Sequence, residues 1–340
     1  MKMDMFRKLG MLLFAGIAIL AISCDLIDED EHDCGLCLRF VYNHNMEFAD
    51  AFRSQINSVD IFVFDDNDRF LFSQKASLAN LIDGNTLMLT DVRSGNYKVL
   101  AIGGLSESFR LSDLGGEDIK AGHTAIEDIQ FALTRNGADM VDLEIPGMWY
   151  AKRLDIIHDS SKQSTWDIEF MKDTNEFNIA LVRDETRGSV IRNDDPTPVH
   201  AYSYEIVSPE GAVYSWENNP ISTEMVTYKP YRLEFNNDDL WTGSLNMCRL
   251  LYDYPGYKLV VRNTRTFKVV WEYDLMKLLA ATKPDNHSSL PMQEYLDRQS
   301  VWNMVIRVQP GGYDDPDAFL ALSVVVNGWI VWINDIETGN

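Results

Sequence analysis

Basic residues are scarce in this chain. It carries 30 lysines and arginines against 52 aspartates and glutamates, so its formal net charge is −22 over 340 residues. Nucleic acids and acidic membrane surfaces would repel such a chain, because binding to phosphates depends on protein cations that release counterions. We therefore exclude nucleic acid as a partner. The hydrophobic share of 46% excludes a disordered chain.

Long apolar runs are also missing, apart from residues 9–22. This run follows the basic residues Lys2, Arg7 and Lys8, and it is too short to span a bilayer comfortably. A short basic start followed by such a run is typical of a secretory signal peptide. We predict that residues 1–23 are a signal peptide; an uncleaved membrane helix is the less favoured alternative.

Cys24 directly follows this run. The residues before it, Leu20, Ala21, Ile22 and Ser23, resemble a bacterial lipobox, although Ala21 stands where Leu, Val or Ile is usual. Cleavage before Cys24 would place a diacylglycerol on its thiol and an acyl chain on its new amino end. Each buried methylene contributes about 0.8 kcal/mol to membrane affinity, so two or three chains anchor a protein durably. The sequence predicts lipidation of Cys24; the alternative is an ordinary signal peptide beside an incidental cysteine.

An acidic segment comes next. Six of the nine residues from 25 to 33 are acidic, and removal of residues 1–23 brings the formal charge to −24, because the removed part carries a net +2. Such a segment cannot bury enough surface to fold. We predict that residues 24–35 form the lipidated cysteine and a solvated tether. Acidic residues at this place also resemble the export signal of surface-displayed Bacteroidetes lipoproteins, whereas the simpler interpretation is a spacer.

Cysteine is rare as well. Besides Cys24 the chain has Cys34, Cys37 and Cys248. In an oxidising envelope Cys248 could pair with either of the other two, which would leave one thiol free. The spacing of Cys34 and Cys37 resembles a redox motif, but that chemistry needs the first thiol at the amino end of a helix. Residues 38–42 alternate like a strand, so we do not predict redox catalysis.

Catalytic motifs are missing too. The six histidines are scattered, and the sequence contains neither a Gly-x-Ser-x-Gly motif nor a glycine-rich loop before Lys-Ser/Thr. We predict no enzyme, no cofactor and no metal. The acidic turns at 65–68 and 314–317 offer oxygen ligands that calcium could use, but they lack the glycine and the distant glutamate of an EF-hand loop. We interpret both as solvated turns.

Strand patterns follow one another along the chain. Residues 59–64 and 70–72 alternate around a polar turn, which is typical of a hairpin. Further strands are predicted at 86–90, 97–102, 129–133, 140–145, 177–182, 202–207, 212–216, 232–235, 245–251, 257–261, 269–273, 302–308, 320–326 and 329–333. Short helices are predicted at 48–56, 275–281 and 292–296. This many short strands with polar turns favours β-sandwiches.

The polar stretch 159–165 predicts a boundary between two sandwiches, at 36–160 and 161–340; a single large sandwich is the alternative. The last strand contains Trp329, Val331 and Ile333 and is apolar on both faces. Such a strand is usually buried in the centre of a core. The functional alternative is a subunit-contact strand that completes the sheet of another subunit.

Three segments resemble one known family. Residues 40–65, the Gly-x-Tyr strand at 95–99, and the Gln-Glu-Tyr-Leu-Asp-Arg segment at 293–298 are similar to the Bacteroidales fimbrillin-associated anchor lipoproteins, and Gly328 with Trp329 fits their closing strand. The resemblance runs from the lipobox to the carboxyl end. One departure is Asp68, which stands where a glycine often closes the first hairpin.

This resemblance implies an all-β fold of two tandem transthyretin-like Greek-key β-sandwich domains. It implies a structural lipoprotein of cell-surface fimbriae, which anchors or terminates a fimbrillin polymer at the outer membrane through strand contacts. Fimbrillin or other fimbrial subunits would be the partners. The alternative function is a surface adhesin that binds a glycan or a host protein through exposed aromatic residues.

Overall fold

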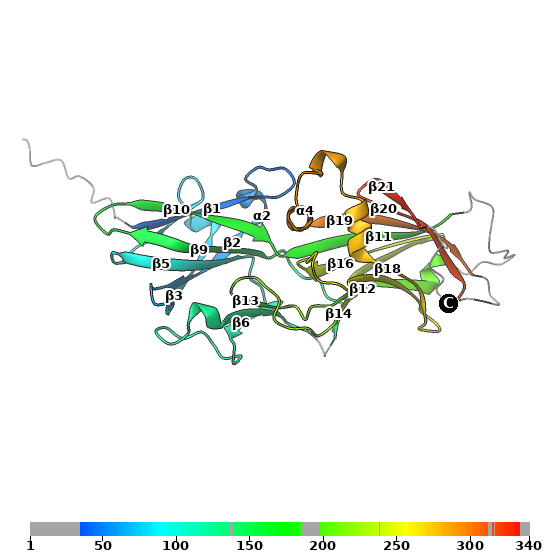
Figure 1. The fold of residues 1–340 in the computed structure, drawn as a ribbon, viewed down its shortest axis with the longest axis horizontal. Coiled ribbons are helices and arrows are strands. Elements are labelled where there is room, and N and C mark those ends of the chain that lie inside the picture. The colour runs from blue at the N-terminus through cyan, green and yellow to red at the C-terminus, as the bar shows by residue number, and fades with distance from the viewer. Residues whose placement is uncertain are drawn as a thin grey trace, which may run out of the picture.

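The computed structural model describes residues 35–135, 139–184, 198–237, 239–311, 315 and 317–333. Within them the chain is built mainly of β-strands with few helices, which confirms the predicted all-β class. The strands form sheets of seven, six, five and three members. They lie along one long axis, with the amino-terminal half at one end and the carboxyl-terminal half at the other (Figure 1). The predicted signal peptide, Cys24 and Cys34 fall outside the described residues.

The seven-stranded sheet makes up most of the first half. Its strand order is β3-β2-β5-β9-β10-β1-β4. The bounds are β1 Leu36–His44, β2 Ser58–Phe64, β3 Phe70–Ser77, β4 Thr86–Leu89, β5 Gly95–Gly103, β9 Trp149–His158 and β10 Ser164–Lys172. β2 and β3 form the predicted hairpin. In its turn Asp65 Oδ1 accepts hydrogen bonds from the main-chain N–H groups of Asn67 and Arg69, each at 2.9 Å, and Asp68 has a φ of 64°, a conformation that favours glycine.

All seven strands contribute side chains to one hydrophobic cluster, so the sheet curves around it. Alternate residues of β2, namely Val59, Ile61 and Val63, point into this cluster and are almost fully buried. The short helix α2, Phe52–Gln55, covers one side of it. Phe52 stacks on Phe40 with ring centroids 5.4 Å apart.

A small sheet packs on the other face of the seven-stranded sheet. It consists of β13 (Val213–Ser215), β7 (Ile129–Leu133) and β6 (Phe109–Asp113). Phe131 in β7 lies 5.9 Å from the ring of Tyr150 in β9 and 5.3 Å from that of Tyr214 in β13. This layer therefore joins strands that are far apart in the sequence.

Two sheets face each other in the second half. The six-stranded sheet has the order β15-β16-β11-β19-β20-β21, and the five-stranded sheet has the order β18-β17-β12-β14-β8. The bounds are β8 Met140–Val141, β11 Thr174–Arg183, β12 Tyr202–Ser208, β14 Val226–Tyr228, β15 Arg232–Asn237, β16 Leu240–Cys248, β17 Lys258–Asn263, β18 Val269–Asp274, β19 Val301–Pro310, β20 Phe319–Val326 and β21 Trp329–Trp332. Tyr204 of one sheet stacks on Trp241 of the other, with ring centroids 4.8 Å apart.

The two halves share strands. β13 lies late in the sequence but pairs with β7, whereas β8 lies early but pairs with β14. One core cluster accordingly contains residues of both halves. The polar stretch at 159–165, where we predicted a domain boundary, contains the turn between β9 and β10. Because β10 pairs with β1 and β9, the first sheet extends to Lys172, past the predicted boundary.

The remaining helices are short. α3 spans Leu275–Ala281, α4 spans Met292–Arg298, and four 3₁₀ turns occupy Leu78–Asn80, Ile126–Asp128, Val199–Ala201 and Asp285–His287. Asp274 caps α3 by accepting a hydrogen bond from the N–H of Lys277, and Leu275, Leu278 and Leu279 bury its apolar face. Among the described residues, no helix has the length and apolar character needed to cross a membrane.

Candidate subunit-contact site

The last described strand, β21, is an edge strand. It follows β20 through a two-residue turn in which Asn327 has a φ of 47° and Gly328 a φ of 89°. Two positive φ values are typical of the Asn-Gly hairpin turn, whose twist matches that of the flanking strands. The two strands pair in antiparallel register, with Val326 opposite Trp329. The turn thereby places β21 on the margin of the six-stranded sheet (Figure 1, red).

Three residues of β21 are largely exposed. Trp329, Ile330 and Trp332 have exposed fractions of 46%, 56% and 51%. Val331 and Ile333 are partly buried and pack against the core of the second half. The prediction of a strand buried on both faces is therefore wrong, because the face that carries Ile330 and Trp332 is exposed and only the opposite face packs on the core.

The structure separates the three residues predicted for a subunit contact. Trp329 is exposed, whereas Val331 and Ile333 pack on their own core. Sequence analysis missed Ile330 and Trp332 as surface residues. The period of two in a strand places them on the face opposite Val331 and Ile333, and this alternation was the signal available in the sequence.

The main chain of Ile330 faces outward. The N–H of Ile333 donates to the carbonyl of Leu322 in the neighbouring strand at 3.1 Å. Since main-chain groups alternate in direction along a strand, those of Ile330 point to the opposite side. Within the described part of the chain, β21 ends the order of its sheet. An edge of this kind can accept a strand from another chain.

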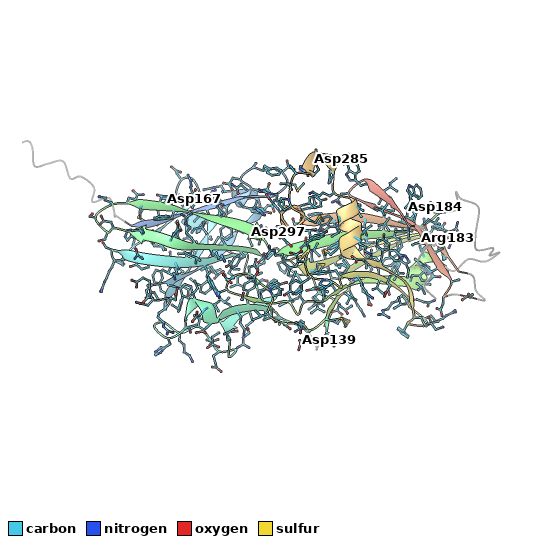
Figure 2. The ribbon with its side chains drawn as sticks, in the orientation of Figure 1. Asp139, Asp167, Arg183, Asp184, Asp285 and Asp297 are labelled. Carbon is cyan, nitrogen blue, oxygen red and sulfur yellow. The ribbon has the colours of Figure 1, made fainter. Side chains whose placement is uncertain are left out.

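The helix α4 lies where the two halves meet, and Figure 2 labels Asp297 there. Arg249, which follows β16, donates two hydrogen bonds to the Asp297 carboxylate: Nε to Oδ1 at 2.7 Å and Nη2 to Oδ2 at 2.8 Å. Gln293, one turn before Asp297, donates to Asp297 Oδ1 and to the carbonyl of Leu250, each at 2.9 Å. These bonds fasten α4 to the end of β16.

Arg298 reaches from the same helix to the first half. Its Nη1 donates to the carbonyls of Asn43 at 3.1 Å and Asn45 at 3.3 Å. Its guanidinium lies 4.5 Å from the ring centre of Phe48, within the range of a cation–π interaction. The segment 293–298, which carried the family resemblance, therefore ties the two halves together.

A buried carboxyl group, Asp173, lies between β10 and β11 at the same junction. Asn218 Nδ2 donates to its Oδ1 at 2.8 Å. Asp173 Oδ2 and Asn218 Oδ1 are both buried and have no hydrogen-bond donor. Burial raises the pKa of Asp173 to about 7, although Arg249 and the bond from Asn218 oppose this shift. A protonated carboxyl would supply the donor that these two oxygens lack.

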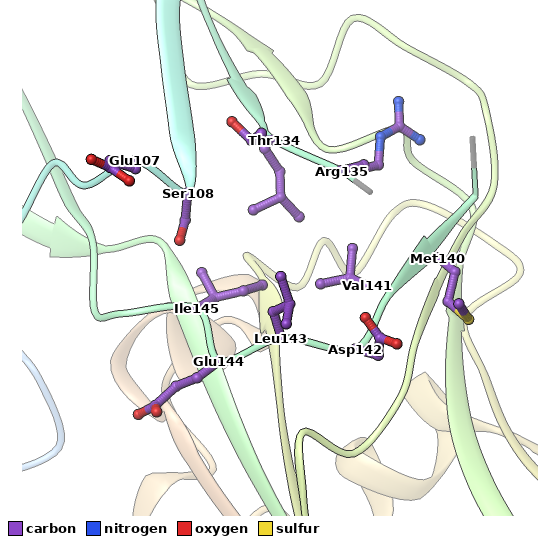
Figure 3. Close-up of a pocket in the computed structure, with 11 residues that line it drawn as sticks. Glu107, Ser108, Thr134, Arg135, Met140, Val141, Asp142, Leu143, Glu144 and Ile145 are labelled. Atoms are coloured by element: carbon purple, nitrogen blue, oxygen red, sulfur yellow. The ribbon is translucent and has the colours of Figure 1, made fainter. Parts of the chain in front are cut away.

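One surface hollow of about 240 Å³ lies beside β8 (Figure 3). Val141, Leu143 and Ile145 lie at its centre, and the carboxylates of Glu107 and Asp142 lie apart from each other at its margin. The hollow thus offers an apolar surface with an acidic margin.

Cys37 and Cys248, the two cysteines among the described residues, do not form a disulfide with each other. Both are free and buried, in β1 and β16, and Cys34 falls outside the described residues. Burial raises the pKa of the Cys248 thiol, so it is a poor nucleophile. Within the described residues, no group of three or more His, Cys, Asp or Glu side chains could hold a metal ion.

Comparison with known proteins gives matches over nearly the whole chain. The family model of the fimbrillin-A associated anchor proteins Mfa1 and Mfa2 matches residues 30–335. A candidate adhesin from Bacteroides ovatus shares 35% identity at a TM-score of 0.76, covering 89% of this chain and 97% of its own. A protein from Bacteroides thetaiotaomicron, named as a candidate polysaccharide-binding protein, shares 25% identity at a TM-score of 0.75, covering 89% and 99%.

The fimbrial anchor protein Mfa2 from Porphyromonas gingivalis has the same fold, with a TM-score of 0.66 at 13% identity over 88% of this chain and 99% of its own. No curated protein matches the chain.

Proposed function

Because this chain belongs to the family of fimbrillin-A associated anchor proteins Mfa1 and Mfa2, we propose that it is a non-enzymatic accessory subunit of cell-surface fimbriae. In this proposal the acyl chains on Cys24 hold the protein to the outer membrane. The folded part binds fimbrillin or another fimbrial subunit through strand contacts, and so anchors or terminates the polymer.

One structural relationship supports this proposal: Leu36, which directly follows the predicted tether, and the contact strand β21 lie in different halves of the molecule. β10 leads into β11, which lies in the second half, so β10 runs toward the junction. β1 pairs parallel with β10. Leu36, the first residue of β1, therefore lies at the outer end of the first half, directly after the predicted tether. β21 belongs to the second half (Figure 1). A chain held at Cys24 would present β21 away from the membrane.

The contact itself would use the open edge of β21. Main-chain hydrogen bonds from a partner strand give affinity in such pairings, and alternate side chains set the register. Ile330 and Trp332 add exposed apolar area, and burial of such area stabilises a contact by about 25 cal/mol per Å² before the costs of association.

A deletion strain tests the proposal. We expect it to assemble fimbriae and to shed them into the medium, and re-expression of the full chain should restore retention. The measurement is the ratio of fimbrillin in the medium to fimbrillin on washed cells. Normal retention of fimbriae in the deletion strain would contradict anchoring.

A second candidate function is adhesion through a glycan. It is supported by a surface groove in the second half, and by the names of two relatives, a candidate adhesin and a candidate polysaccharide-binding protein. The two functions are compatible, since a fimbrial accessory subunit can also carry a ligand site.

A further inference from the structure

A groove of about 350 Å³ opens between the two facing sheets of the second half. β12, β15 and β17 contribute to its walls, together with the turn that joins β17 to β18. Its volume is within the range of small-ligand pockets, about 300–1,000 Å³. It lies on the side of β15, whereas β21 forms the opposite edge of the six-stranded sheet.

The groove exists because one strand stops short. β17 pairs with residues 202–207 of β12, but β14 pairs only with residues 206–208. After Tyr228 the chain leaves the five-stranded sheet and enters β15 of the other sheet. Among the described strands, none pairs with the β14 side of residues 202–205, so the sandwich is open there.

Two exposed phenylalanines line the groove from opposite sheets. Phe235 on β15 is 62% exposed, and Phe267, in the turn after β17, is 76% exposed. Phe267 also has a φ of 60°, which is unfavourable for a bulky residue and is usually taken by glycine or asparagine. An exposed aromatic ring held in a strained turn gains no stability from burial. This combination is typical of a binding site.

Polar side chains also line the groove. Glu205 is only 4% exposed, and its Oε1 accepts a hydrogen bond from Arg262 Nε at 2.6 Å. Lys229 Nζ lies 3.9 Å from Oε2, too far for a hydrogen bond. Glu205 Oε2 can therefore accept from a ligand. Arg262 Nη1 also donates to the carbonyl of Phe267 at 3.4 Å, and so connects Glu205 to the turn that carries the exposed Phe267 ring.

We propose that this groove binds a neutral glycan. Flat apolar faces contact the C–H faces of a sugar ring, while a carboxylate and a guanidinium exchange hydrogen bonds with its hydroxyl groups. Glu205 and Asp142 balance Arg262 and Lys229 in the lining, and the chain as a whole is strongly acidic. Both facts favour a neutral sugar over an anionic one. A charged pair in the lining also fits a sugar better than an apolar peptide strand.

The test uses the purified full chain and does not depend on anchorage, so its outcome is independent of fimbrial retention. Maltotriose, cellotriose and mannotriose are titrated by calorimetry, with 3′-sialyllactose as the anionic comparison. Tryptophan fluorescence is a second measurement, because Trp241 lies in the lining, 6.1 Å from the ring of Phe235.

We expect saturable binding of at least one neutral trisaccharide. Phe235→Ala, Phe267→Ala and Glu205→Gln should each weaken it by about tenfold or more. Because the two phenylalanines are exposed, their removal leaves the core intact, and the fold is checked by circular dichroism. Tyr252→Ala is the matched control, since Tyr252 is 44% exposed and lies outside the groove; it should bind like the unaltered chain.

Three results would overturn the inference. The first is that none of the neutral trisaccharides binds. The second is that binding is unchanged in both phenylalanine variants. The third is that the groove binds only sialyllactose, or only a peptide with the sequence of residues 329–333, which would make it a site for an anion or for a polypeptide strand.

Discussion

Arg249 and Asp297 form a two-point ion pair at the junction of the two halves, with N–O distances of 2.7 and 2.8 Å. Their side chains are only 14% and 7% exposed. Asp297 lies on the helix that also holds the first half through Arg298. The pair therefore links the end of β16 to a helix, α4, that contacts both halves.

Asp297→Ala should destabilise the chain by about 3–5 kcal/mol, because loss of one partner leaves a buried charge without compensation. The measurement is the free energy of unfolding from denaturant titration. The control is Asp155→Ala. Asp155 pairs with Arg153 but its side chain is 70% exposed, so its removal should cost less than about 1 kcal/mol. Equal effects of the two substitutions would contradict the role given to the junction.

The raised pKa of Asp173 predicts an unusual dependence of the free energy of unfolding on pH. Its pKa is about 7 in the folded chain, against an ordinary value of 3.8. Between these two values the folded state binds a proton that the unfolded state has lost, so stability should fall as pH rises from about 4 to 7 and level off above. The size of the fall is at most about 4 kcal/mol.

Asp173→Asn removes the titrating group and keeps an oxygen that can accept from Asn218. Its free energy of unfolding should change less between pH 4 and 7 than that of the unaltered chain. Denaturant titrations across this range provide the measurement. If the two proteins show the same slope, Asp173 does not titrate as described.

The outward edge of β21 can be tested with proline. Ile330→Pro removes an N–H that points away from β20, which an edge strand tolerates. We expect the purified chain to stay folded but to lose incorporation into fimbriae, measured by co-purification with fimbrillin. Val331→Pro is the contrasting variant, because by the same alternation its N–H faces β20; loss of this ladder hydrogen bond should lower the free energy of unfolding by about 1–3 kcal/mol. Unchanged incorporation of Ile330→Pro would exclude this edge as the contact.

Local pattern was sufficient to predict most strands. The alternation of Val59, Ile61 and Val63 predicts β2, and α3 was predicted over 275–281 with the bounds that the structure shows. These elements could be predicted because burial of one face gives a strand a hydrophobic period of two and a helix one of 3.6, and a sequence displays both periods directly.

Long-range pairing could not be predicted in the same way. β13 and β8 are only three and two residues long, and each pairs across the two halves. The polar residues at 159–165 suit a hairpin turn as well as a linker, so the sequence alone could not distinguish β10 from the start of a second unit. β21 is as apolar as a core strand, and its sequence does not show that it ends the sheet or that the face with Ile330 and Trp332 is exposed.

The groove was not predicted for a similar reason. Phe235 and Phe267 are separated by a hairpin, a strand and a turn, and nothing in their spacing places them on opposite walls of one groove. Nothing in the sequence marks Glu205 and Arg262 as a pair, because they come together only when β12 pairs with β17.

The central claim is that Cys24 fixes a fimbrial subunit to the outer membrane. Its most direct test is expression of Cys24→Ser in the deletion strain, followed by separation of medium, soluble envelope and membrane fractions. We predict that the protein leaves the membrane fraction and that fimbriae appear in the medium, because in this proposal the thioether of Cys24 carries the diacylglycerol. If the variant stays in the membrane fraction and the cells retain their fimbriae, the account is wrong.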